Sequence, residues 1–338
     1  MKKTKVSVRR LWIVTLLLLI GLAIVFLLSL NLGFTHMSTW KVIQTLFGSG
    51  NTEDSLVLFH FRLPRMVIAM LCGAGIAVAG AILQSITRND LSDPGILGIN
   101  SGAGLAVVLY LYFFQGSTTG LAASSVFLLP IAAFAGALSA ACLIYFVSWN
   151  QGTSPLRLIL SGIGLNSAFL AIIIVFQMRM DPSDFTQATI WLSGSIWGSD
   201  WSDVLAVLPW TVLLIPLAIS QSRKLNILAL GDSVATGLGI RTERERIIFL
   251  LLSVALAGSS VSVGGGISFL GLIAPHITRR LVGAGHQSVL PISALLGALI
   301  LLAADTLGRS IWAPSEIPVG LVVSAIGAPY FIYLLIKE

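Results

Sequence analysis

The chain has 338 residues, of which 56% are hydrophobic and only 10% are charged. A soluble domain carries roughly 25% charged residues, so this composition excludes an ordinary soluble enzyme and predicts an all-α protein that crosses a membrane many times. The net charge of +6 would suggest a nucleic-acid partner in a soluble chain. Here the placement of the basic residues matters more, and we expect no nucleic-acid partner.

The first apolar segment, 11–30, follows the basic start MKKTKVSVRR. It is too long for the apolar part of a typical signal peptide and lacks a small-residue cleavage site, so we expect a membrane span that starts inside. A spanning helix needs roughly 20 apolar residues. Eight further segments meet or approach this length: 66–86, 95–114, 122–149, 158–178, 204–220, 247–263, 289–304 and 317–336. A tenth, 267–281, is shorter and contains Pro275.

The distribution of basic residues favours counting the tenth segment. With ten spans and the N-terminus inside, 15 of the 20 basic residues lie in inner segments, against 13 with nine spans. Because Lys and Arg are enriched on the cytoplasmic side, the sequence predicts ten spans with both termini cytoplasmic. The five basic residues left outside are Lys41, Arg62, Arg65, Arg179 and Arg309.

Two outer segments, about 31–64 and about 179–203, are long enough for local structure. In the first, we expect Ser38 to cap a surface helix with Trp40 and Ile43 on one face, together with Phe47. The second contains four aspartates and three tryptophans. Tryptophans at that depth are more typical of an interfacial belt than of a ligand site.

The longest polar interval in the second half of the chain is the inner segment at about 222–246. We expect Asp232 or Ser233 to cap a short helix that runs through Leu238, with Gly239 in the left-handed conformation that ends it. The small residues of this segment indicate a surface that packs closely against another protein. A plain solvated loop with membrane-retention charges is the alternative, and charge alone favours it.

Small residues within the apolar segments predict close contacts between helices. Gly73, Ala77 and Ala81 are four residues apart, and Gly297 and Leu301 show a weaker form of the same spacing. The two cysteines, at 72 and 142, lie in apolar segments, where we expect buried small side chains rather than a disulfide.

Several kinds of chemistry are missing from the sequence. There is no GxxxxGK[ST] nucleotide-binding motif and no HExxH motif, and the four histidines are scattered. Nearly every carboxylate lies in a loop or at the end of a span, and Asp305 comes closest to a buried ion-coupling group. We therefore expect a transport subunit that has no catalytic residue, metal or cofactor of its own and that another protein drives.

Eight stretches occur in an order that covers most of the chain. They are RLPR (62–65), NDLSDPGILGINSGAG (89–104), LILSGIGLN (158–166), GSIWGSDW (194–201), LNILALGDSVATGLGI (225–240), GGISFLGLIAPHITR (265–279), ADTLGR (304–309) and EIPVGLVVSAIGAPYFIYLL (316–335). This ordered set resembles the permease family of ATP-driven importers for iron chelates and cobalamin. One departure is Asn89-Asp90, where family members often have Asn-Pro.

The resemblance implies one permease domain, 1–338, with the ten-helix fold of type II importers in the cytoplasmic membrane. It implies a second permease, identical or related, a dimeric ATPase that alone uses ATP, and an extracytoplasmic binding protein. The implied cargo is an iron(III)-siderophore complex, with cobalamin or haem as alternatives. An ion-coupled secondary transporter is the less favoured reading.

The resemblance also assigns roles to individual residues. The ATPase-coupling loop would use Leu230, Gly231, Asp232, Ala235, Leu238 and Gly239. Binding-protein docking would use Arg62, Arg65 and Arg309, because arginine can bind a carboxylate through two hydrogen bonds. From position alone, snorkelling at the interface or pairing with Asp305 or Glu316 accounts for these arginines equally well.

Overall fold

The computed structural model describes residues 8–32, 39–46, 48, 50–95, 97–114, 125–150, 152, 154–311 and 315–337, and this part of the chain contains helices and no strand. The helices are α1 (Val8–Asn31), α2 (Thr39–Leu46), α3 (Thr52–Leu56), the π-helical turn η1 (Val57–Arg62), α4 (Leu63–Thr87), α5 (Ile99–Phe114), α6 (Ser125–Ser148), α7 (Pro155–Gln177), α8 (Pro182–Leu192), α9 (Trp201–Ser220), α10 (Ser222–Leu228), α11 (Asp232–Gly237), α12 (Thr242–Gly264), α13 (Leu270–Val282), α14 (His286–Ile311) and α15 (Val319–Lys337).

Eight helical segments of the described chain are long and apolar enough to cross a membrane. They are α1, the continuous segment α3–η1–α4, α6, α7, α9, α12, α14 and α15. Helices α5, with 16 residues, and α13, with 13 residues, lie where the other two spans are predicted but are shorter. The protein is therefore a multi-pass helical membrane protein, and a count of ten crossings stays a prediction.

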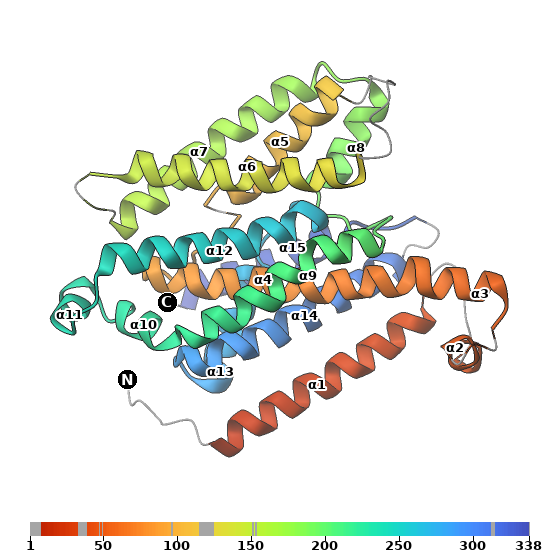
Figure 1. Cartoon of the computed structure of the whole chain (residues 1–338), viewed down its shortest axis with the longest axis horizontal. Helices are drawn as coiled ribbons and strands as arrows, with labels where there is room; N and C mark the ends of the chain where they lie inside the picture. Colours follow the sequence, from red (N-terminus) through yellow and green to blue (C-terminus); the bar gives the residue numbers. More distant parts are fainter. Residues whose placement is uncertain are drawn as a thin grey trace.

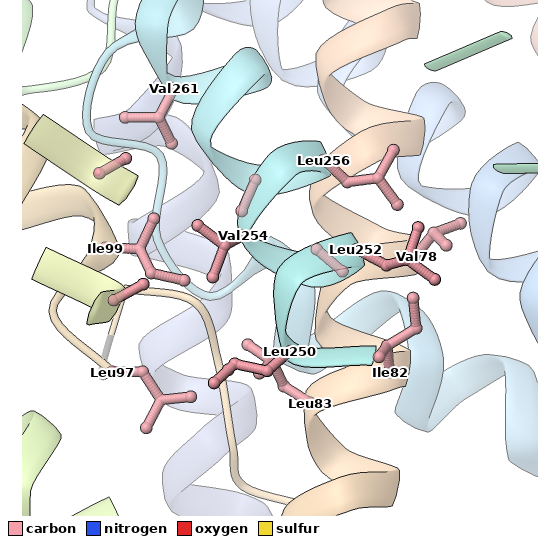
Figure 2. Close-up of a cluster of buried hydrophobic side chains, with 14 of the residues drawn as sticks. Val78, Ile82, Leu83, Leu97, Ile99, Leu250, Leu252, Val254, Leu256 and Val261 are labelled. Atoms are coloured by element: carbon pink, nitrogen blue, oxygen red, sulfur yellow. The ribbon is translucent and has the colours of Figure 1, made fainter. Parts of the chain in front are cut away.

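Helix α4 lies at the centre of the bundle, between α12, α14 and α9 (Figure 1). Most side chains of α4 and α12 are buried, whereas few of those of α1 and α7 are. Figure 2 shows the apolar contact between α4 and α12, which is joined by Leu97, shortly before α5, and by Ile99, the first residue of α5. The labelled residues of the two helices are Val78, Ile82, Leu83, Leu250, Leu252, Val254, Leu256 and Val261.

Glycines bring α4 and α14 into backbone contact. A Cβ on Gly73 would lie 2.8 Å from the carbonyl carbon of Gly297, and a Cβ on Gly297 would lie 2.5 Å from the Cβ of Ala77. The close contact predicted from the four-residue spacing of small residues is thus confirmed for these positions. Such contacts hold membrane helices together through packing, because lipid provides no hydrophobic driving force between them.

The short helices divide between the two ends of the bundle (Figure 1). Helices α10 and α11 lie at the end where α1 begins and α15 ends, which we call the inner end. Helices α2, α3 and α8 lie at the opposite, outer end. This arrangement agrees with the predicted placement of the polar segments and puts both ends of the described chain on one side.

The outer start of α4 differs from the prediction. We expected a span from residue 66 with a loop before it, but the helix continues through Pro64 back to Thr52. In a π-turn each backbone N–H donates to the carbonyl five residues earlier, so residue 64 would donate to Phe59. Proline has no N–H, and the carbonyl of Phe59 therefore lacks this donor. The indole Nε1 of Trp201 donates to this carbonyl at 2.7 Å. A long-range contact therefore stabilises the turn.

Two local predictions have mixed outcomes. Helix α2 is present where a surface helix is predicted, with Trp40 and Ile43 exposed, but Ser38 and Phe47 lie outside the described residues. Cys72 is buried as expected, whereas Cys142 is exposed. The second prediction was wrong because an apolar segment of a membrane bundle can face outward as well as inward.

Candidate functional site

The inner segment contains two short helices, α10 and α11, and the second lies where a short helix is predicted. Gly239 has φ +81°, which confirms the left-handed residue after the second helix. The predicted cap is wrong, because Gly231, with φ +109°, occupies the N-cap position and no side chain caps the helix. The carboxylate that we expected at the cap, that of Asp232, has other partners.

Asp232 ties α11 to the two most buried helices of the bundle. Its Oδ1 lies 2.7 Å from Nη2 of Arg246 in α12, and its Oδ2 lies 3.3 Å from Nη2 of Arg88, the left-handed C-cap of α4. Arg246 also pairs with Glu243 at 3.2 Å, and the hydroxyl of Tyr145 in α6 donates to Glu243 at 3.0 Å. A displacement of α11 would therefore act on α4, α6 and α12 together.

The opposite face of the inner segment is apolar and exposed. Leu230, Val234 and Leu238 are four residues apart and keep 56%, 45% and 60% of their surface accessible. Ala235 points inward and is fully buried. Beside them is a shallow, open cavity of about 380 Å³, lined by Thr236, Gly239, Ile240, Arg241, Thr242 and Glu243. Exposed apolar patches on a polar segment are typical of docking surfaces.

The structure divides the six predicted coupling residues into two groups. Leu230, Leu238 and Gly239 are exposed, whereas Gly231, Asp232 and Ala235 hold α11 in place. Sequence reasoning missed Val234, although the spacing between positions 230 and 238 could have indicated it. Pairing between Asp232 and Arg88 has no local sequence signal, because the two residues are 144 positions apart.

At the outer end, the three predicted docking arginines form one cluster: Arg65 and Arg309 both pair with Asp305, and Arg62 lies near Arg309. Nε of Arg65 donates to Asp305 at 2.8 Å and its Nη1 to Glu316 at 2.7 Å. Arg309 lies 3.6 Å from Asp305 and donates to the backbone carbonyls of Ser29 and Leu32. Arg62 donates to the neighbouring carbonyl of residue 30. Cations suit these positions because the last carbonyls of α1 have no partner within their own helix.

These three arginines differ in accessibility. Arg62 and Arg309 are each only 6% exposed. The side chain of Arg65 is 13% exposed, and that of its partner Glu316 is 31% exposed. In the structure Arg65 pairs with Asp305 and Glu316. This pairing is one of the alternatives that the sequence left open. Docking of a binding protein on this cluster stays a prediction.

The departure from the family pattern at Asn89-Asp90 has a structural counterpart. Oδ1 of Asp90 lies 3.1 Å from Nη2 of Arg279, and Arg279 also donates to the amide oxygen of Gln84. These contacts join the inner end of α4 to α13. In the described ranges, no three His, Cys, Asp or Glu side chains are grouped so that they could hold a metal ion.

Known proteins resemble this chain over nearly its full length. The FecCD transport family matches residues 19–337. An iron(3+)-hydroxamate import system permease protein of Bacillus subtilis is 56% identical over 96% of each chain. An iron-uptake system permease protein of the same organism is 41% identical over 92% of this chain and 93% of its own. A solved metal-chelate type ABC transporter in an inward-facing conformation matches with a TM-score of 0.83 and 32% identity, over 96% of this chain and 98% of that one.

Proposed function

Since this chain belongs to the FecCD transport family, we propose that it moves an iron(III)-siderophore complex across the cytoplasmic membrane as the permease subunit of an ATP-binding-cassette importer. The names of the similar B. subtilis permeases support an iron cargo. A hydroxamate chelate is the first candidate, because the relative at 56% identity is named for one.

The inner segment is the observation that carries the coupling part of the proposal. A partner ATPase dimer would cover Leu230, Val234 and Leu238, which otherwise expose apolar surface outside the membrane. Closure of the ATPase on ATP would move α11, and the ion pairs of Asp232 would pass that movement to α4 and α12. ATP is bound and hydrolysed only by the partner.

The outer cluster supports docking of an extracytoplasmic binding protein through Arg65. Its present partner Glu316 is partly exposed, so a carboxylate on the binding protein can replace Glu316 at the guanidinium. Arg62 and Arg309, which are buried against α1, would hold the docking surface in shape. A second permease, identical or related, would complete the pathway, with both termini of each chain in the cytoplasm.

Reconstitution tests the proposal directly. Vesicles that contain this chain alone should accumulate no iron-loaded hydroxamate against a gradient, and addition of the ATPase, binding protein and any second permease should give ATP-dependent uptake. The same vesicles should take up haem and cobalamin poorly. Uptake that survives ATP depletion but disappears when an ion gradient collapses would contradict the proposal and favour a secondary transporter.

A further inference from the structure

Three polar side chains join α10 to α4 and α14 at the inner end of the bundle. The backbone N–H of His286, the first residue of α14, donates to Oδ1 of Asn226 in α10 at 2.9 Å. Nδ1 of the His286 ring lies 2.6 Å from the same oxygen. On the other side of the ring, Nε2 contacts Oγ of Ser85 in α4. Both His286 and Ser85 are only 6% exposed.

The direction of these hydrogen bonds follows from their partners. Oδ1 of Asn226 accepts the backbone N–H of His286, while its Nδ2 donates to Oε1 of Gln287 at 2.9 Å. The amide orientation is thereby fixed, so the ring nitrogen that faces Oδ1 must carry a proton. Nε2 of a neutral ring is then an acceptor. The Ser85 hydroxyl, which also lies 2.8 Å from the carbonyl of Ala81 in its own helix, can donate to Nε2 in place of that carbonyl. Both nitrogens of His286 are used, each by a different helix.

This arrangement differs from the apolar packing around it. Leu225 and Leu228 of α10 are buried at 0% and 4% exposure, but apolar contacts of this kind tolerate small shifts between helices. Hydrogen bonds between buried groups are directional and costly to leave unmade, so they fix the position of α10 along α4 and α14. Asp232 provides the corresponding link for α11.

We propose that His286 is a positioning residue for coupling: it transmits movement of α10, under the ATPase, to α14 and through Ser85 to α4. This inference rests on the proposed function. It predicts that the bridge needs both side-chain hydrogen bonds, because loss of either one weakens the connection between α10 and one of the two helices.

Three substitutions separate the two ends of the bridge. The side-chain amide in His286→Asn can replace Nδ1 toward Asn226 but does not reach Ser85. In His286→Gln the amide can replace Nε2 toward Ser85, but the side-chain hydrogen bond to Asn226 is lost, and only the backbone N–H of residue 286 still donates to Asn226. Ser85→Ala removes a single oxygen and leaves the histidine in place. Ser259→Ala is the matched control, because Ser259 is buried and its hydroxyl donates to Leu256 in its own helix.

The assay uses the complete transporter in proteoliposomes, with iron-loaded hydroxamate as the probe. It measures cargo transported per ATP hydrolysed, together with the amount of ATPase that copurifies. We expect the three bridge variants to retain the ATPase and to lose roughly five- to tenfold in transport per ATP, within the usual range of coupling between sites. Ser259→Ala should match the unsubstituted protein.

Two results would overturn this inference. One is unchanged transport per ATP in Ser85→Ala, which is the variant least able to disturb folding. The other is loss of the ATPase from the bridge variants, because His286 would then only support the docking surface. Failure of the proposed function itself looks different: the unsubstituted complex would bind no ATPase or would transport nothing in an ATP-dependent way.

Discussion

Replacing Gly297 with alanine should force α14 away from α4. The new Cβ would lie 2.5 Å from the Cβ of Ala77 and would also meet the carbonyl oxygen of Gly73. Ordinary carbon contacts are about 3.5–4.0 Å long, so the two helices would have to separate by roughly 1–1.5 Å. Overpacking of this kind costs about 1–3 kcal/mol. This loss of stability arises at the contact of α14 with α4, the central helix of the bundle.

Thermal unfolding of the detergent-purified chain, followed by size-exclusion chromatography after heating, measures this effect. At roughly 2–4 °C per kcal/mol, the apparent melting temperature of Gly297→Ala should fall by several degrees. Gly164→Ala is the control, because a Cβ at Gly164 of α7 meets nothing within 4 Å. A Gly297→Ala protein that melts at the same temperature as the Gly164→Ala protein would refute the close approach of the two backbones.

Three further predictions concern the surfaces and one helix cap. Val234→Glu should abolish copurification of the ATPase, because it places a charge among the exposed apolar residues Leu230, Val234 and Leu238. Ser233→Glu, on the same helix but outside this apolar surface, should leave copurification intact. If both variants retain the ATPase equally, the apolar surface is not the docking surface. Arg65→Gln should weaken binding-protein docking about tenfold or more in a salt-dependent way, because a charged hydrogen bond is lost. Glu316→Gln should not weaken docking, because it removes the carboxylate that competes for Arg65. If the unsubstituted protein and Arg65→Gln bind the binding protein with equal affinity, Arg65 is not part of the docking site. Asp200 caps α9, and the nearby Ser202 hydroxyl holds the pKa of its carboxyl below the ordinary value. Asp200→Ala should cost about 1 kcal/mol at neutral pH. The pKa of Asp200 is lower in the folded than in the unfolded state. Its contribution to stability is therefore present above about pH 4 and is lost as the pH falls through the folded-state pKa. The melting temperatures of the unsubstituted protein and Asp200→Ala should converge in acid.

Local sequence patterns predicted the features that depend on neighbouring residues. The four-residue spacing of small side chains identified the contact at Gly73 and Gly297. The distribution of basic residues placed both termini and the segment at about 222–246 on one side, and they do share one end of the bundle. Gly239 was predicted correctly because the end of a short helix often requires a left-handed residue.

The features that the sequence did not reveal depend on residues far apart in the chain. The carboxylate of Asp232 could have served as a cap, but it pairs with Arg88 and Arg246, which only the folded bundle brings close. The outer segment was expected to run to Pro64, before a span that starts at residue 66. The helix instead continues back through Pro64, and Trp201 contacts the π-turn there. Helix-end chemistry is thus decided by the competition between local and tertiary partners.

The length of the central helix has a consequence for communication between the two sides of the membrane. From Thr52 to Thr87 it runs without a break for 36 residues, which is roughly 54 Å at 1.5 Å per residue, against a hydrocarbon thickness of about 30 Å. Arg65, roughly 20 Å along this segment from Thr52, and Ser85, close to Thr87, therefore lie on one continuous helical segment. Under the docking proposed above, a binding protein at Arg65 would act on the inner end of the bundle through one continuous helical segment, without relay through a loop.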